Sequence, residues 1–177
     1  EGNPQGIILD FRGNGGGYLG VAVEMANQFL AANDVIVYTE GASCPTQIEK
    51  ANGYGFFQNI PLVVLVDETS ASASEIVSGA LQDWDRATII GRPSFGKGLV
   101  QRQIPMVDGS AVRLTVARYH TPTGRVIQRP FEKGKREEYY ANLMKRLTGD
   151  YALDSVALDT LPKYKTLIKG RTVYGGG

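Results

Sequence analysis

Ser72 and Lys97 are the two residues whose types and settings could support nucleophilic catalysis. Ser72 opens the segment Ser72-Ala73-Ser74-Glu75, shortly after an apolar run at residues 62–66. A short apolar run followed by helical spacing predicts a strand that turns into a helix at Ser72. The free N–H groups and the positive dipole end of that helix would face the serine. The hydroxyl would then be either a helix cap or a nucleophile beside ready-made oxyanion donors.

Both interpretations of Ser72 stay open at this point. Ser72 and Glu75 have the spacing of a capping box, in which serine bonds the third helical amide and glutamate reaches back. A nucleophile needs a base, and Lys97, between Gly96 and Gly98, is a candidate because the glycines let its backbone bend inward. A lysine amine is charged at neutral pH and must be desolvated before it can take a serine proton. An exposed loop lysine is the simpler interpretation of the same residue.

Histidine is the usual base of serine hydrolases, and His120 is the single histidine of the sequence. A Ser72–His120 pair is possible, but no Gly-x-Ser-x-Gly elbow surrounds Ser72. With no motif around it, we interpret His120 as a surface or packing residue.

Two glycine-rich stretches come close to nucleotide-binding motifs without matching them. A dinucleotide fingerprint starting at Gly13 would need glycine at position 18, where Tyr18 stands. Residues 91–98 lack the Ser or Thr that follows the lysine of a phosphate-binding loop, and they lead into an expected strand instead of a helix. Successive glycines still let N–H groups approach an anion, so residues 13–17 form either part of an oxyanion hole or a tight turn.

Length and composition favour one folded domain and exclude several function classes. With 177 residues, 42% of them apolar, the chain is long enough for one well-buried core. A net charge of +1 gives no electrostatic case for binding nucleic acid. No apolar run approaches the roughly 20 residues of a membrane span. The single Cys44 excludes an internal disulfide and a multi-cysteine metal site.

The elements that must position these residues alternate along the chain, and this order predicts a parallel α/β sheet. Residues 39–60 show no clear period, and the turns are expected at residues 107–110 and 121–124. The expected strands are residues 6–11, 35–38, 62–66, 87–90, 99–104, 112–116 and 167–174, and the expected helices are residues 19–30, 72–84 and 135–147.

Four motifs, in this order, resemble the carboxy-terminal processing (tail-specific) proteases, which are serine endopeptidases with a Ser–Lys dyad. The motifs are residues 10–17, 70–75, 95–101 and 119–125. The similar stretch covers roughly residues 5–128, and the interval between Ser72 and Lys97 suits that family. The resemblance implies an α/β fold with a ClpP/crotonase-like core, a mixed β-sheet and flanking helices.

The same resemblance implies a role for six residues. Ser72 would be the nucleophile, Lys97 the general base, and Gln101 would hold the lysine or a dyad hydrogen bond in place. The oxyanion hole would come from Gly16 or Gly17 together with the amide of Ala73. No metal or organic cofactor is implied, and the expected partner is a polypeptide substrate.

The expected organisation is a peptidase catalytic core at residues 1–130 and a helical extension at residues 131–177, packed on the same domain and truncated at Gly177. The resemblance implies a PDZ-type domain upstream in the full-length protein, and export to the periplasm, cell envelope or extracellular space.

Two other functions fit the same scaffold. One is a non-catalytic binding module for hydrophobic ligands or peptide tails. The other, for which no basic CoA-binding patch is evident, is a crotonase-like enzyme acting on acyl thioesters.

Overall fold

The computed structural model describes residues 4–148 and 161–176 of the chain. Within these residues the strands form a parallel sheet of order β1-β4-β5, an antiparallel sheet of order β3-β2-β7-β6, and a pair β8-β9. The strands are β1 (Ile7–Asp10), β2 (Val35–Gly41), β3 (Cys44–Lys50), β4 (Leu62–Val66), β5 (Thr88–Gly91), β6 (Leu99–Pro105), β7 (Ala111–His120), β8 (Lys163–Lys165) and β9 (Thr172–Tyr174). The helices are α1 (Leu19–Asn27), α2 (Ala73–Asp83) and α3 (Arg136–Thr148).

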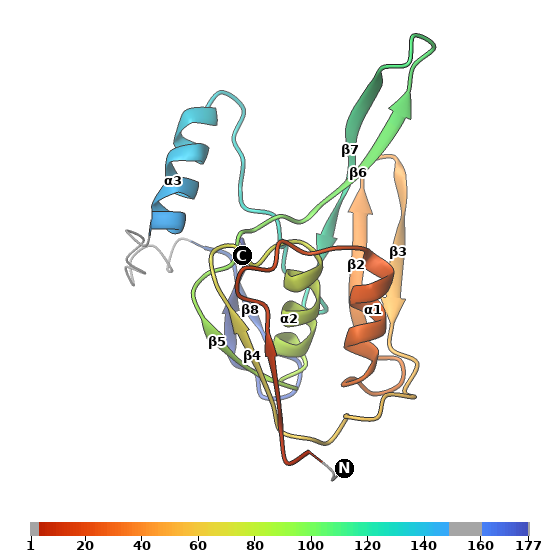
Figure 1. The fold of residues 1–177 in the computed structure, drawn as a ribbon, viewed down its shortest axis with the longest axis vertical. Helices are drawn as coiled ribbons and strands as arrows, with labels where there is room; N and C mark the ends of the chain where they lie inside the picture. The colour runs from red at the N-terminus through yellow and green to blue at the C-terminus, as the bar shows by residue number, and fades with distance from the viewer. Residues whose placement is uncertain (1–3, 149–160, 177) are drawn as a thin grey trace.

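The core forms where α1 and α2 contact each other, with the parallel sheet to one side and the antiparallel sheet to the other (Figure 1). Alternate residues of β4 are buried, as expected for a strand that packs helices on one face. Helix α2 is apolar or small along most of its surface and is buried almost throughout. Its N-terminus is therefore fixed by the packing of the whole core.

The hairpin β6–β7 reaches beyond the body of the molecule (Figure 1). Its turn lies where the sequence predicts it, since the Met106 N–H donates to the Ser110 carbonyl at 2.8 Å and Gly109 has φ +84°. Along most of this hairpin both faces are exposed. The second predicted turn is also present, with the Gly124 N–H donating to the Thr121 carbonyl at 2.9 Å.

The α/β class is confirmed, with the parallel and antiparallel strands divided between separate sheets instead of one mixed sheet. The strand expected at residues 35–38 does not pair in parallel with β1; as β2, it pairs antiparallel with β3 and β7. The tight reversal from β2 into β3 allows antiparallel pairing, whereas a parallel neighbour needs a long crossover. Sequence reasoning missed β3 because its exposed, mainly polar residues have no buried face to create a period.

The residues after Pro130 form the predicted helix as α3, and the last expected strand shortens to β9. Helix α3 has no buried residue and stands apart from the two main sheets in Figure 1. It is joined to the core by Arg146, which donates to the Ser94 carbonyl at 2.8 Å. None of the helices in the described ranges is both long and apolar enough to cross a bilayer. The division at residue 130 stays a prediction.

Candidate active site

Ser72 immediately precedes α2 in a backbone conformation that few side chains adopt. Its φ is +56° and its ψ is −113°, and the residue is half-buried. Such a conformation costs free energy and persists only where the surroundings impose it. The preceding turn supplies that support, because the Ser70 hydroxyl donates to the Phe11 carbonyl at 2.7 Å and the Asp67 carboxylate accepts the Ser70 N–H at 3.0 Å.

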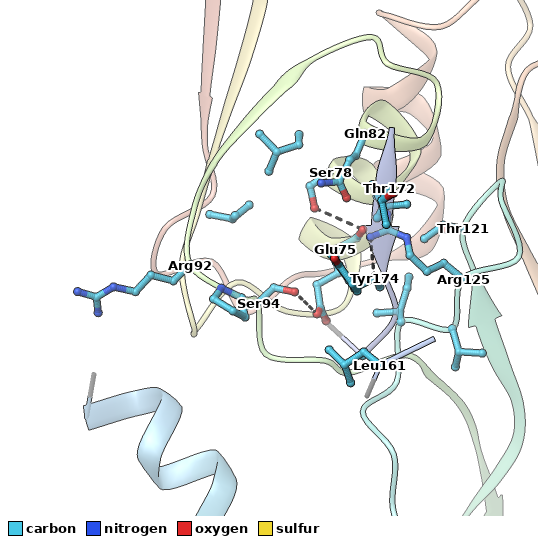
Figure 2. Close-up of a pocket in the computed structure, with 18 of the residues that line it drawn as sticks. Glu75, Ser78, Gln82, Arg92, Ser94, Thr121, Arg125, Leu161, Thr172 and Tyr174 are labelled. Carbon is cyan, nitrogen blue, oxygen red and sulfur yellow. Dashed lines mark hydrogen bonds between the residues drawn. The ribbon is translucent and has the colours of Figure 1, made fainter. Parts of the chain in front are cut away.

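Glu75 links Ser72 to the loop that carries Lys97. Its Oε2 accepts the N–H of Ser72 at 2.8 Å and the N–H of Lys97 at 2.9 Å. Its Oε1 accepts the Gly96 N–H and the Ser94 hydroxyl, both at 2.6 Å, and the latter bond is drawn in Figure 2. Burial raises the pKa of Glu75, while these four hydrogen bonds to the ionised carboxylate oppose the rise. One carboxylate thus holds both candidate catalytic residues by their backbones.

The two halves of the predicted capping box differ in quality. The Glu75 half is well formed, as its carboxylate accepts the Ser72 N–H at 2.8 Å. The Ser72 hydroxyl faces the Glu75 N–H, as the box requires, but that N–H donates to the Ser72 carbonyl at 2.9 Å and the hydroxyl makes no cap hydrogen bond. Ser72 therefore precedes the helix without committing its hydroxyl to it, which leaves the nucleophile interpretation open.

The side chain of Lys97 is exposed, although its backbone is fixed. The neighbouring Phe95 N–H donates to the Ser70 carbonyl at 2.9 Å, a further tie between the loop and the Ser72 turn. Gln101 is also exposed, and its Nε2 lies 3.4 Å from Thr115 Oγ1, longer than a strong hydrogen bond. Within the described residues Lys97 Nζ is bonded neither to Ser72 nor to Gln101, so the dyad and the role of Gln101 stay predictions.

The glycine loop is pressed against the start of α2 at Gly16. A Cβ atom there would lie 2.5 Å from the Ala71 carbonyl oxygen and 2.8 Å from the Ala73 nitrogen, and φ is +96°. Only glycine fits this close approach. Asn14 fastens the loop, because its carbonyl accepts the Ala71 N–H at 3.0 Å and its Oδ1 accepts the Gly16 N–H at 2.9 Å.

The predicted oxyanion donors lie together at this contact. Ala73 is the first residue of α2, where an N–H has no acceptor within the helix. Gly16 already donates its N–H to Asn14, and in the described part of the chain Gly17 makes no such bond. Gly16, Gly17 and Ala73 also line a cavity of about 110 Å³ whose other lining residues are mostly apolar, among them Phe11, Ala22, Met25 and Val77. This cavity suits a small apolar side chain.

The cavity in Figure 2 lies along another face of α2. Its volume is about 250 Å³, and Glu75 and Ser94 line it, whereas Ser72 and Lys97 do not. Arg125, which also lines it, donates to Asp83 Oδ1 at 2.7 Å and to the Tyr174 carbonyl at 3.1 Å. These hydrogen bonds of Arg125 join β9 and the turn at residues 121–125 to α2, so Arg125 stabilises the fold here.

His120 is packed away from any role as the base. Its Nδ1 lies 3.2 Å from the Gly124 carbonyl, its Nε2 lies 3.5 Å from Glu40 Oε2, and its ring stacks on Tyr38 at 4.8 Å between centroids. Both ring nitrogens therefore have partners other than Ser72. This supports the interpretation of His120 as a packing residue.

Sequence reasoning did not find the roles of Asn14, Ser94 and Glu75 in holding the site together. The capping-box spacing identified Glu75, but only as a partner of Ser72. Its bonds to residues 94–97 and the position of Asn14 depend on contacts between distant segments, and no local signal marks them.

Comparison with known proteins relates this arrangement to one family. Residues 1–134 match the sequence profile of Peptidase family S41. A carboxy-terminal-processing protease of Bartonella bacilliformis is 46% identical over 125 residues, which are 70% of this chain and 29% of that protein. A carboxyl-terminal-processing protease of Synechocystis is 44% identical over 122 residues, 69% of this chain and 28% of that protein.

Solved structures agree with this relation. A photosystem II D1 C-terminal processing protease superposes with a TM-score of 0.66 at 41% identity, covering 70% of this chain and 32% of that one. Mature CPAF complexed with lactacystin superposes with a TM-score of 0.58 at 15% identity, which shows the fold alone. The chain spans between a quarter and a third of the length of the curated relatives and of the D1 protease.

Proposed function

Since this chain belongs to peptidase family S41, we propose that it forms the catalytic core of a serine endopeptidase that cleaves polypeptides, in C-terminal processing or tail-specific proteolysis. The observation that carries the proposal is the shared acceptor at Glu75 Oε2, which binds the N–H groups of Ser72 and Lys97. Two backbones on one oxygen lie close enough for the long, flexible lysine side chain to reach the serine hydroxyl.

The proposed reaction begins with a neutral Lys97 amine. It takes the proton of the Ser72 hydroxyl as Oγ bonds to the substrate carbonyl carbon, and the carbonyl oxygen becomes an oxyanion. The amide of Ala73, with that of Gly16 or Gly17, stabilises this charge. The prior bond from Gly16 to Asn14 favours Gly17 as the second donor.

The tetrahedral intermediate then collapses. Lys97 gives its proton to the leaving nitrogen as the C–N bond breaks, and an acyl ester remains on Ser72. Water that loses a proton to Lys97 then attacks the ester carbonyl. As the bond to Ser72 Oγ breaks, Lys97 returns that proton to Oγ, which releases the acid product and restores both the serine and the neutral amine. Because Lys97 is exposed in the free chain, the bound polypeptide would cover it and favour the neutral amine. Gln101 would orient the amine at that stage.

The experiment is cleavage of an unfolded protein such as casein by the full-length protein and its variants. Ser72→Ala and Lys97→Ala should each lower the rate by roughly 10³-fold or more, with unchanged circular dichroism. His120→Ala should cleave normally if it folds. Retained activity in either dyad variant would remove the assignment, and loss confined to His120→Ala would make the base a histidine.

A second candidate is a non-catalytic binding module for peptide tails or hydrophobic ligands. The exposed side chain of Lys97 favours it, since a hydrated amine is a poor base. Such a module would bind peptides as wild type and as Ser72→Ala with equal affinity, and would release no cleaved product from either.

The family also bears on where the full-length protein acts in the cell. One relative, from Tetradesmus obliquus, is named a chloroplastic C-terminal processing peptidase. We keep export to the periplasm, cell envelope or extracellular space as a proposal, with a PDZ-type domain ahead of this core in the full-length protein. Cell fractionation with an antibody to the chain would test the location.

A further inference from the structure

Arg129 carries a buried guanidinium with two donors that no other described residue uses. The residue is only 5% exposed, and within residues 4–148 and 161–176 its Nε and its Nη2 both lack a hydrogen-bond partner. Buried polar groups are nearly always paired, so a buried arginine with two empty donors requires an explanation. The surroundings of these two donors indicate what kind of group they could bind.

Another arginine of the chain shows what the Nε and Nη2 side of a guanidinium binds. Arg12 uses Nε and Nη2 to hold the Asp10 carboxylate, with N···O distances of 2.9 and 2.7 Å. This two-pronged pairing matches the geometry of a carboxylate. In Arg129 the equivalent pair of donors is buried and empty. Burial makes a bond to it stronger than the exposed Arg12 pair, because water competes less.

Arg129 is also held rigidly. Its guanidinium lies 4.4 Å from the ring centroid of Tyr139 in α3 and 5.6 Å from that of Phe95. Its N–H donates to the Gly96 carbonyl at 3.0 Å, so its backbone is bonded to the residue before Lys97. A side chain packed against two rings loses little freedom when it binds, which favours affinity.

The cavity beside Arg129 is large enough for part of a peptide. Its volume is about 550 Å³, and most of its lining is aromatic and aliphatic, including Leu99, Phe131, Tyr139 and Tyr164. Leu99 lies two residues after Lys97 in the sequence. Arg118 also lines this cavity, but it is exposed, whereas Arg129 is buried. A mostly apolar cavity with cationic groups at its wall suits an apolar peptide segment that carries a carboxylate.

We propose that Arg129 and this cavity form a subsite that binds a carboxylate of the polypeptide substrate, a few residues from the bond that Ser72 attacks. The carboxylate is either the free C-terminus or an Asp or Glu side chain. The inference rests on the proposed endopeptidase function. It adds to that function a specificity residue that lies just ahead of the extension, with one wall of the subsite contributed by α3.

The kinetic test starts from a peptide that the full-length protein cleaves out of casein. It is remade with a C-terminal amide, and with each Asp or Glu replaced in turn by Asn or Gln. One of these changes should raise KM roughly tenfold to a hundredfold with little change in kcat. The position of that change tells the C-terminus from a side chain. In Arg129→Met, KM should be raised already and should no longer respond to the change.

Two further variants separate the pairing from general effects. Arg129→Lys keeps the charge and loses the two-pronged geometry, so it should recover only part of the affinity for the carboxylate. This variant replaces Arg129→Met in the test if Arg129→Met does not fold. Arg113→Met removes an exposed arginine of β7 and should keep the full carboxylate dependence. The subsite proposal would be overturned if the KM did not change when any of the peptide carboxylates was removed. It would also be overturned if the KM of Arg129→Met still depended on the carboxylate.

A binding measurement keeps this outcome distinct from that of the proposed function. Fluorescence anisotropy of the labelled peptide with the Ser72→Ala protein needs no turnover. If no protein form cleaves but binding depends on the carboxylate and on Arg129, the endopeptidase proposal fails and the subsite stands. If cleavage occurs and the binding affinity does not depend on the carboxylate, the subsite proposal fails and the endopeptidase proposal stands.

Discussion

Glu75, in α2, and Arg129, in the segment between β7 and α3, are two buried charged residues that contact the Lys97 loop. Glu75 accepts the N–H of Gly96, and Arg129 donates its own N–H to the Gly96 carbonyl. The Glu75 carboxylate accepts hydrogen bonds from four donors of its own chain, whereas two guanidinium donors of Arg129 have no acceptor in the part of the chain that the structure describes. A buried charged group whose hydrogen bonds are all satisfied holds the surrounding backbone in place. A buried charged group with unsatisfied donors is suited to binding a ligand. The difference separates the part of the site that is prearranged from the part that awaits substrate.

The largest effect is expected from a change at Glu75. In Glu75→Gln the side chain has one acceptor oxygen and one NH2 group, so it cannot serve donors at both of its ends. The loop should move relative to Ser72, and kcat should fall about a hundredfold, with a loss in the free energy of unfolding of about 1–3 kcal/mol. Casein cleavage and thermal unfolding measure the two effects. Glu24→Gln, at an exposed position of α1, should change neither.

A smaller effect is expected where the glycine loop meets α2. Gly16→Ala places a methyl group against the Ala71 and Ala73 backbones and strains a positive φ, so the loop must withdraw. We expect about 1–3 kcal/mol of destabilisation and a roughly tenfold loss of kcat. Gly15→Ala is the matched control, because a Cβ at Gly15 meets nothing within 4 Å. Equal effects of the two changes would show that the contact at Gly16 does not matter.

The smallest expected effect is one of pH, and it sharpens the role of Glu75. Burial raises the pKa of the Glu75 carboxyl in the folded chain. As the pH rises, this carboxyl therefore ionises in the unfolded chain before it ionises in the folded chain. The contribution of Glu75 to stability is therefore complete below its ordinary pKa and is lost as pH rises through the folded pKa. The ionised carboxylate is the form that accepts four bonds, so kcat should rise over the same interval.

Opposite slopes of stability and activity on the acid side are therefore the signature of Glu75 as a positioning residue. Thermal unfolding and kcat, each measured against pH for wild type and Glu75→Gln, would show them. A role in stability alone would leave the acid limb of kcat the same in both proteins.

Sequence reasoning succeeded where the information is local. The strand and helix around Ser72 follow from a buried apolar run and helical spacing, and the turn at Gly109 from its residue types. It was incomplete where distant segments meet. The bonds from Glu75 to the Lys97 loop span 21 and 22 residues, and the surroundings of Arg129 combine α3 with residues on both sides of it. No local period records such contacts.

Chemical labelling shows most directly whether Ser72 is an activated nucleophile. The full-length protein is treated with a fluorophosphonate, which reacts with activated serines, and the modified peptide is mapped by mass spectrometry. We expect one adduct, on Ser72, that is absent from Ser72→Ala and strongly reduced in Lys97→Ala. No adduct on the folded protein, or an adduct that forms on another serine and survives in Ser72→Ala, would contradict it.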